Sequence, residues 1–568
     1  MYRYLTLLGL ILATASSQAG ISGQVVDDLT GEAISGARVR IQTSLAEPEI
    51  SGFDGRFALP DPTDDNVTVT AVTPFDSAAA INYITGSAPA GPGDAIEIRL
   101  TRLPLADQAP YDPGSSVECA SCHFDQFSQW QESRHAGAGV NPWVLDLFSG
   151  DGTPGGAEGF VFRDTHDADD TGFCATCHNP VADAQDPGNV FMNEVTSDSG
   201  LDGVGCLGCH QMAEVNENTN SLHHLGNTLY RFPEDSSTPL WVWGPLDDVS
   251  FDIMRASYQP GFSDSRYCAS CHQYNNPNTG APGQTTFDEW LASPFAEPGP
   301  GFRSCQDCHM PPAEQDGPIS TLFGQPHRPA EQRRSHQFVG SNPQTLAAAI
   351  DLELHWQIAG GQLQIQARVI NHGAGHAFPT GVSIRNAVLV IEATANGQAL
   401  TQISGPTIPF YGSAHGGTEA GDVAGQPGRG FARVLQGRIN GEGESVYPVL
   451  FIDAETVRSD TRIPAGQSDR SDYEFSLEGV FGGQAEVSAR LLYRRAWRDL
   501  AITKNWDETP SGGPIEIEAE RVTAQIDLND IAGPVQMIPA MRPWAMLALI
   551  SLLMASAWAT GSRDHLRP

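Results

Sequence analysis

Short runs in which apolar and polar residues alternate, separated by Gly, Pro and Asp turns, occupy two parts of the chain. In residues 20–103 we expect strands at Ile21–Val26, Ala37–Gln42, Arg56–Leu59, Val67–Val72 and Ala95–Leu100. In residues 341–530 we expect strands at Leu352–Ile358, Leu363–Ile370, Ala387–Ala393, Val446–Ile452, Tyr473–Leu477 and Ala485–Tyr493. A Gly-rich stretch, 411–445, is expected to be a long loop. Because alternation with a period of two buries one face of a strand, each part predicts a β-sandwich.

Residues 104–340, between the two β-rich parts, show little periodicity and are rich in Gly, Pro, Asp and Asn. One helix is predicted directly after His123, where Phe124, Phe127 and Trp130 recur at helical spacing. The expected fold is therefore multidomain, with an irregular, mostly α-helical centre between two β-sandwiches.

All ten cysteines lie in this central part, in Cys-x-x-Cys-His pentapeptides. The five pentapeptides, called motifs 1 to 5, are Cys119/Cys122/His123, Cys174/Cys177/His178, Cys206/Cys209/His210, Cys268/Cys271/His272 and Cys305/Cys308/His309. This spacing is the attachment site of c-type haem, in which two thiols bond to the porphyrin and the adjoining imidazole binds the iron. Disulfides do not need the histidine, and zinc sites pair such units, which suits an odd number badly. We therefore expect five covalently attached c-type haems, which replace much of the apolar core of residues 104–340.

Both ends of the chain carry signals for a membrane. Residues 1–19 have a basic start, an apolar run and small residues before Gly20, as in a secretory signal peptide cut after Ala19; an uncleaved anchor is the alternative. Residues 543–562 carry no charge and are long enough for a transmembrane helix, with a basic tail after them. Ile538, Pro539 and Trp544 also resemble the start of bacterial C-terminal sorting tails.

These signals predict an exported protein. It is expected to be periplasmic and anchored to the inner membrane by its C-terminal helix, or to reach the cell surface after the tail is processed. The expected organisation is a signal peptide (1–19), a β-sandwich (20–103), a pentahaem domain (104–340), a second β-sandwich (341–530), and a linker with transmembrane helix and basic tail (531–568).

The chain is strongly acidic, with 68 Asp and Glu against 32 Lys and Arg, and a formal net charge of −36. A negative field of this size argues against nucleic acid as a partner. We expect redox proteins or quinol-linked membrane complexes as partners instead.

The first β-rich part resembles the carboxypeptidase regulatory-like domain. The resemblance rests on Gly23–Asp27, Ile34–Val39 and Asp54–Phe57, which stand where that family has its Gly-x-Val, Gly-Ala-x-Val and Asp-Gly-x-Phe elements. It implies a structural or adhesive module without catalytic residues.

Residues 115–530 resemble the cytochrome c-554/hydroxylamine oxidoreductase type of multihaem cytochrome. Three elements carry this resemblance and imply distal iron ligands, namely Trp-x-x-Ser-x-His at His135, His-x-Phe-x-Gly at His336, and Gly-x-Gly-His-x-x-Pro-Thr-Gly at His376. For the remaining irons we expect one histidine of the pair His223 and His224, with His224 preferred, and His166, with His327 next.

The expected function is electron transfer through closely packed, mostly bis-histidine haems in anaerobic or extracellular respiration. No catalytic residue is expected, because an iron with two histidines has no vacant position. An alternative is a multihaem reductase or oxidoreductase of a small nitrogen or sulfur oxyanion at one five-coordinate iron. Phe295 keeps this open, since it stands where an internal repeat has His135. Assembly into a cell-surface complex is a third expectation, compatible with the first.

Overall fold

A computed structural model describes residues 20–104, 106–107, 114–215, 228–232, 241–250, 254–276, 278–322, 324–529 and 536–538. The expected signal peptide, transmembrane helix and basic tail lie outside these residues, as do His223 and His224. Within the described part of the chain, no helix has the length and apolar character needed to cross a bilayer.

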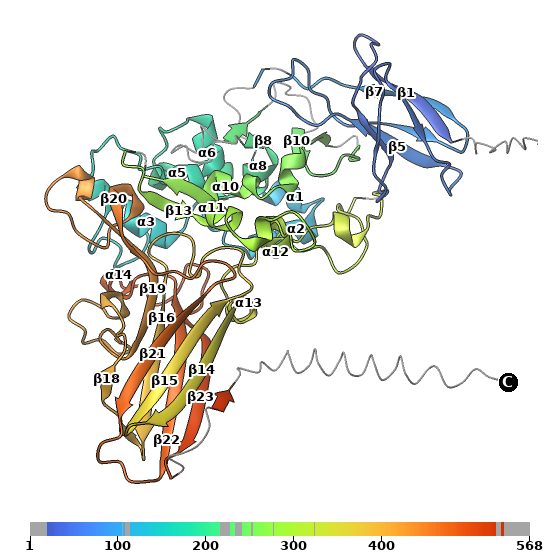
Figure 1. Ribbon diagram of the computed structural model, residues 1–568. Helices are drawn as coiled ribbons and strands as arrows, with labels where there is room; N and C mark the ends of the chain where they lie inside the picture. Colours follow the sequence, from blue (N-terminus) through green and yellow to red (C-terminus); the bar gives the residue numbers. More distant parts are fainter. Residues whose placement is uncertain are drawn as a thin grey trace, which may run out of the picture.

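Residues 20–103 form two small facing sheets at one end of the molecule (blue in Figure 1). One sheet has the order β4-β1-β7, with β1 Ile21–Asp27, β4 Arg56–Leu59 and β7 Ala95–Leu100. The other has the order β3-β2-β5-β6, with β2 Arg38–Ile41, β3 Glu49–Ile50, β5 Val67–Val72 and β6 Gly86–Ala90. Their shared core is apolar and closed to solvent, as the expected alternation requires; it includes Ile21, Val25, Val39, Val69 and Ile98.

The central part consists of short helices and two-stranded ribbons joined by long connections. Its helices are α1 Val117–Ala120, α2 Phe124–Gln131, α3 Pro142–Phe148, α4 Phe162–Thr165, α5 Cys174–His178, α6 Pro180–Gln185, α7 Asp198–Leu201, α8 Cys206–His210, α10 Arg266–His272, α11 Thr286–Leu291 and α12 Cys305–His309. Its ribbons pair β8 Met212–Val215 with β9 Thr228–Tyr230, β10 Trp241–Gly244 with β11 Arg255–Tyr258, and β12 Gln273–Asn275 with β13 Pro282–Thr285. Helix α2 is the helix expected after His123.

Residues 341–529 begin with α13 (Pro343–Ala349) and form a sandwich of two antiparallel sheets below the central part in Figure 1. The five-stranded sheet has the order β18-β21-β15-β14-β24, with β14 Ile350–Ala359, β15 Gln362–Asn371, β18 Gln402–Ser404, β21 Ser468–Ser476 and β24 Gln536–Ile538. The other has the order β20-β19-β16-β22-β23, with β16 Asn386–Ala395, β19 Gly428–Gly437, β20 Ala454–Asp460, β22 Gln484–Arg494 and β23 Glu516–Asp527, and β17 Gln398–Ala399 on β16. Alternate residues of these strands fill one continuous core, among them Leu352, Leu389, Phe431 and Val487.

Two expectations for this unit are wrong. Residues 411–445 are not one long loop, because they contain the ten-residue strand β19. Residues 446–452 are not a strand; they make an isolated bridge at Val446 and then enter a 3-10 turn, Phe451–Asp453. The expected linker also contributes to the fold, since β24 pairs with β14 at Leu354–Trp356.

Lys504, the only lysine of the chain, links the C-terminal sandwich to the central part through buried hydrogen bonds. Lys504 follows α14 (Arg498–Thr503) and is fully buried. Its Nζ donates to the carbonyl oxygens of Asp146, Gly156 and Phe160 at 3.0, 2.5 and 2.7 Å. Trp506 donates to the Asp146 carboxylate at 2.6 Å, so the charge and its surroundings are hydrogen-bonded as burial requires.

Candidate functional site

Each Cys-x-x-Cys-His motif adopts a single helical turn or lies at the end of one. Helices α5, α8 and α12 begin at the first cysteine of their motif and end at its histidine. In a helix, residues three and four apart lie on one face. The spacing therefore directs the two thiols and the imidazole toward the same side, which is what attachment to one porphyrin requires.

Cys122, the second expected attachment cysteine of motif 1, differs from this pattern because it lies just after the end of α1. The turn still continues through the motif, since the N–H groups of Cys122 and His123 donate to the carbonyl of Cys119 at 3.1 and 2.8 Å. The helix does not extend further, as the carbonyl of Cys122 accepts from the distant N–H of Thr321 at 2.7 Å. Its Sγ lies 3.5 Å from the hydroxyl of Ser121. Cys122 stays a predicted attachment residue, but the structure pairs its thiol with a hydroxyl.

Thiols of different motifs lie next to one another and interact. A hydrogen bond between Cys119 and Cys206 raises the pKa of Cys119 and lowers that of Cys206 to about 7. In the same way a bond to Cys271 raises the pKa of Cys177. At the third such contact, a bond from Cys268 lowers the pKa of Cys305.

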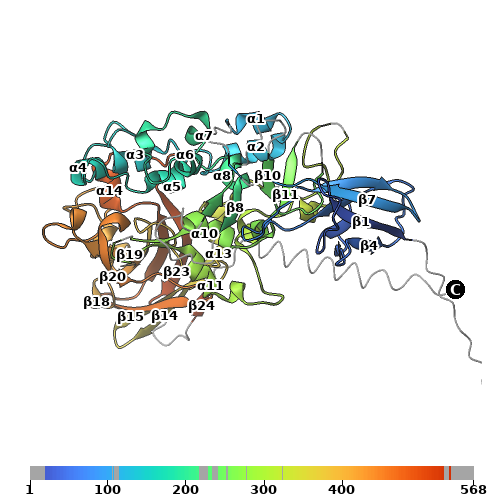
Figure 2. The ribbon, with the colours of Figure 1, turned by 90° about the horizontal axis from the view of Figure 1, so that it is seen from above.

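These thiol contacts join motif 1 to motif 3, motif 2 to motif 4, and motif 4 to motif 5. The thiols of motifs 3 and 4 also interact electrostatically, through Cys209 and Cys271. The five motifs are therefore one continuous cluster rather than five separate sites. The short helices that carry them, α5, α8 and α10 among them, lie together in the centre of Figure 2.

At four motifs the Nδ1 atom of the histidine pairs with a backbone carbonyl oxygen. The distances are 3.1 Å from His123 to Ile319, 3.0 Å from His178 to Ala138, 2.7 Å from His210 to Trp243 and 2.6 Å from His309 to Val339. A carbonyl only accepts, so it holds the proton on Nδ1 and leaves the lone pair of Nε2 for a metal. This is the arrangement that an iron-binding imidazole needs, and the two cysteine thiols of each motif complete the set of groups for a c-type haem.

His135, an expected distal ligand, faces the histidine of motif 4. The ring centres of His135 and His272 are 6.3 Å apart. Two metal–nitrogen bonds of about 2 Å and two imidazole radii of about 1.2 Å would place ring centres about 6.4 Å apart across one metal ion. Burial lowers the pKa of His135 to about 4, which keeps the ring neutral and able to bind iron.

His376, a second expected distal ligand, faces the histidine of motif 5. The rings of His376 and His309 are 6.4 Å apart and nearly parallel, at 11°. The turn that carries His376 packs closely against the central part, because a Cβ on Gly375 would lie 3.3 Å from Trp290. His376 Nδ1 pairs with the carbonyl of Ala377 at 3.1 Å, so its Nε2 is the nitrogen left for iron.

His336, a third expected distal ligand, lies near motifs 1 and 3. Burial lowers its pKa to about 4, with smaller effects from His210 and then from His123. Its Nδ1 pairs with the carbonyl of Arg334 at 3.0 Å. Phe338 lies between two of the expected ligands, 4.4 Å from the ring of His135 and 6.0 Å from that of His336.

His166 is placed differently from the other expected ligands. Its Nε2 is 3.0 Å from Oδ1 of Asp453, a residue of the C-terminal unit, and both side chains are buried. Burial also raises the pKa of Asp453, whose Oδ2 has no hydrogen-bond partner among the residues that the structure describes. A cavity of about 400 Å³ adjoins the pair, and Asp170 and Phe173, next to motif 2, also line it. His166 stays a predicted ligand, but the structure pairs its Nε2 with a carboxylate.

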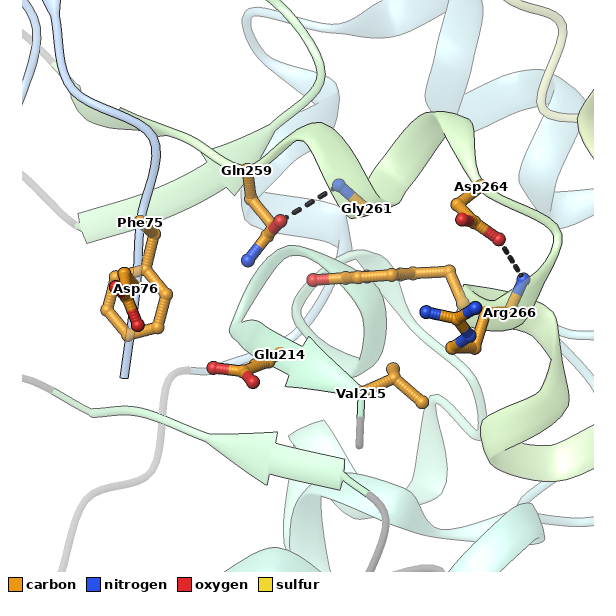
Figure 3. Close-up of a pocket in the computed structure, with 9 residues that line it drawn as sticks. Phe75, Asp76, Glu214, Val215, Gln259, Gly261, Asp264 and Arg266 are labelled. Atoms are coloured by element: carbon orange, nitrogen blue, oxygen red, sulfur yellow. Dashed lines mark hydrogen bonds between the residues drawn. The ribbon is translucent and has the colours of Figure 1, made fainter. Parts of the chain in front are cut away.

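A second, smaller cavity of about 240 Å³ lies where the N-terminal sandwich meets the central part (Figure 3). Phe75 and Asp76 approach it from the N-terminal side, and Glu214, Gln259 and Arg266 are among the residues on the other. Both ends of the Gln259 amide are hydrogen-bonded there, since it accepts from Gly261 at 2.8 Å and donates to the carbonyl of Ala213.

The sequence did not reveal Glu289, a residue of α11 that reaches the turn carrying His376. Its Oε2 accepts from Thr380 Oγ1 at 2.6 Å and from the backbone N–H of Ala377 at 3.2 Å. Its Oε1 accepts from Arg462 at 2.6 Å. Because its partners come from distant segments of the chain, no local pattern in the sequence marks this carboxylate.

Comparison of the chain with protein-family models found no match, and comparison with curated proteins found none. Among solved structures, the chain is similar to the crystal structure of a penta-heme cytochrome c552 from Thermochromatium tepidum, at 22% sequence identity and a TM-score of 0.48. The match covers 72% of this chain and 98% of that chain. The five motifs of the chain itself carry the functional proposal.

Proposed function

We propose that this chain is an exported pentahaem c-type cytochrome that transfers electrons through closely packed haems. The observation that carries the proposal is the single cluster of motifs, in which four of the five motif histidines hold Nδ1 on a backbone carbonyl. Its kinship with the cytochrome c-554/hydroxylamine oxidoreductase type is part of the proposal. When bound, each haem supplies a one-electron redox couple whose potential the protein tunes.

The proposed role of the protein chain is to bind the haem irons and to leave no coordination position open for a substrate. His135 with His272, and His376 with His309, stand at the separation of two ligands on one metal. An iron held in this way has no position for a substrate, so it exchanges electrons and does no further chemistry. His336 serves an iron at motif 1 or 3 in the same way, and His224 and His166 are the proposed ligands for the others.

The order of the motifs in space suggests the route of the electrons. Thiols of motifs 1 and 3, 2 and 4, and 4 and 5 are in contact, so haems bonded to them are neighbours. Motif 4 takes part in two of these contacts and lies at the junction. Motifs 3 and 4 also interact, through Cys209 and Cys271, so motifs 1, 2 and 5 are the ends where electrons are expected to enter and leave.

We also propose where the protein is located and with which partners it exchanges electrons. The protein is periplasmic and held at the inner membrane by its C-terminal helix, or reaches the cell surface after tail processing. It exchanges electrons with redox proteins or quinol-linked membrane complexes in anaerobic or extracellular respiration. The N-terminal carboxypeptidase regulatory-like sandwich is a structural or adhesive module, suited to a surface assembly.

The haem assignment is tested by removing the thiols of one motif. Replacing Cys305 and Cys308 with alanine is expected to lower the haem content from five to four per chain, measured by the pyridine haemochrome assay. The matched control is Glu314→Ala, an exposed residue shortly after the same motif, which leaves both thiols in place and is expected to keep five. An unchanged haem-to-protein ratio in the double variant would contradict the assignment.

One observation favours a second function, reaction of a small molecule at an open iron. The carboxylate of Asp453 pairs with Nε2 of His166, the nitrogen that an iron would need, beside a cavity that adjoins motif 2. Carboxylates of Asp170 and Asp453 line this cavity, so it would repel an oxyanion and suits a neutral or cationic nitrogen compound such as hydroxylamine better. A high-spin signal that shifts on adding hydroxylamine supports this function, and a protein with low-spin iron alone excludes it.

A further inference from the structure

The histidine of motif 4 differs from the other four in the group that meets its Nδ1 atom. At motifs 1, 2, 3 and 5 that group is a backbone carbonyl. At motif 4, Nδ1 of His272 lies 2.8 Å from Nε2 of Gln284, a side-chain amide on β13. A carbonyl always accepts a hydrogen bond, whereas an amide accepts through its oxygen or donates through its nitrogen.

Gln284 is buried, with 8% of its surface exposed, and is the first member of a hydrogen-bonded chain. Its Nε2 lies 3.4 Å from Thr286 Oγ1, which is 3.0 Å from Thr380 Oγ1. Thr380 Oγ1 donates to Glu289 at 2.6 Å. The chain thus runs from His272 to the carboxylate that also holds the N–H of Ala377, beside His376.

The amide of Gln284 and the imidazole of His272 conflict once iron binds Nε2 of that imidazole. A neutral imidazole then carries its proton on Nδ1, where it meets the N–H of the amide. Two donors repel each other, so the amide is expected to turn its oxygen toward His272 and accept the Nδ1 proton in a hydrogen bond. The side chain at position 284 then influences how much electron density the imidazole passes to the iron.

We propose that Gln284 is a positioning residue that sets the reduction potential of the iron at motif 4, the junction of the thiol contacts. This inference rests on the proposed function, because it requires a haem at that motif. A hydrogen-bond acceptor on Nδ1 makes the imidazole a stronger donor and stabilises oxidised iron, which lowers the potential. Gln284 acts on one iron of the five, and its side chain, unlike a backbone carbonyl, is open to substitution.

The test is a spectroscopic redox titration of the haem-loaded protein with two near-isosteric variants. Gln284→Glu places a carboxylate acceptor at Nδ1 and is expected to lower the midpoint potential of one haem. Gln284→Met removes the amide and is expected to raise the potential of the same haem. Because methionine carries no charge, its shift reports the hydrogen bond alone.

Gln398→Glu adds the same charge on the exposed strand β17 and is the matched control, expected to leave all five potentials unchanged. Haem content is measured for every protein. A wild-type protein with fewer than five haems would contradict the proposed function. Five haems whose potentials stay unchanged in both Gln284 variants, or all shift together, would overturn the inference on Gln284 alone.

Discussion

Six histidines of the central cluster (His123, His178, His210, His309, His336 and His376) are oriented by a hydrogen bond between Nδ1 and a backbone carbonyl. His376 shows this most fully, because its Nδ1 pairs with Ala377 and its own carbonyl accepts from Asn371 at 2.8 Å. Fixing the ring before a ligand arrives removes part of the entropy cost of ordering it. Replacement of such a residue is therefore expected to alter one iron and leave the fold intact.

Replacing His376 with alanine is expected to convert one iron of five from low-spin to high-spin and make it accessible to cyanide. The reason is that His309 then has no imidazole 6.4 Å away to share its metal. Electron paramagnetic resonance and cyanide titration measure the change. His372→Ala is the control, since His372 is partly exposed and pairs with Asp351 at 3.2 Å. An unaltered spectrum in His376→Ala would refute the pairing.

Asp27, a buried carboxylate of the N-terminal sandwich, is expected to contribute to the stability of the protein in acid. Burial opposes the ionisation of Asp27, but hydrogen bonds from Arg102, Thr30, Tyr83 and Leu29 outweigh it and hold the pKa of its carboxyl well below the usual value. Its stabilising effect is therefore complete above the unfolded pKa of about 3.9 and is lost as the pH falls toward the folded pKa.

Thermal unfolding between pH 6 and pH 2 checks this effect. Wild type is expected to lose stability steeply below about pH 4, near the unfolded carboxyl pKa. Asp27→Asn is expected to be less stable at pH 6 and to show a shallower loss in acid. The control Asp28→Asn changes an exposed neighbour and is expected to follow wild type. Parallel curves for wild type and Asp27→Asn would contradict the role of this carboxylate.

Single residues also show what the sequence could and could not reveal. The motif cysteines and histidines are marked by their spacing alone, which is local. The Nδ1 partners, Gln284 and the backbone carbonyls, are brought in by folding, and Asp453 reaches His166 from 287 positions away. Such long-range partners leave no pattern that a single sequence displays.

At the scale of elements, strands with alternating residues were predictable and a Gly-rich strand was not. Strand β19 holds Gly428, Gly430 and Gly437 because neighbouring atoms leave no room for a side chain. A Cβ on Gly430 would lie 2.2 Å from the hydroxyl of Tyr411, and one on Gly437 would lie 1.9 Å from the carbonyl of Asp453. The glycines that suggested a loop are therefore required by close packing within a sandwich.

Lys504, directly after α14, is expected to stabilise the contact between α14 and the central part. Replacing it with methionine keeps the length of the side chain but leaves three buried carbonyl oxygens without a donor. The expected loss of unfolding free energy is about 1–3 kcal/mol. Urea unfolding measures it, with exposed Arg470→Met as the control. A variant as stable as wild type would show that the buried charge does not stabilise this contact.

At the level of the whole molecule, the N-terminal sandwich packs directly against the central part and is not held only by the connecting chain. Arg328 and Asp248 form an ion pair at 2.8 Å with both side chains almost fully buried, and Asp248 also accepts from the backbone of Thr43 at 2.6 Å. Phe75 packs edge-on against Trp243 at 5.8 Å. Trp243 in turn supplies the carbonyl that holds His210, so this sandwich supports the region around motif 3.

The proposed protein holds five haems in one electron-transferring cluster. Haem quantification by the pyridine assay, together with low-temperature electron paramagnetic resonance on the oxidised protein expressed without residues 539–568, tests this directly. We expect five haems per chain and low-spin signals alone. Fewer than five haems, or a stoichiometric high-spin signal that shifts with hydroxylamine, would contradict it, the second result by revealing an open, reactive iron.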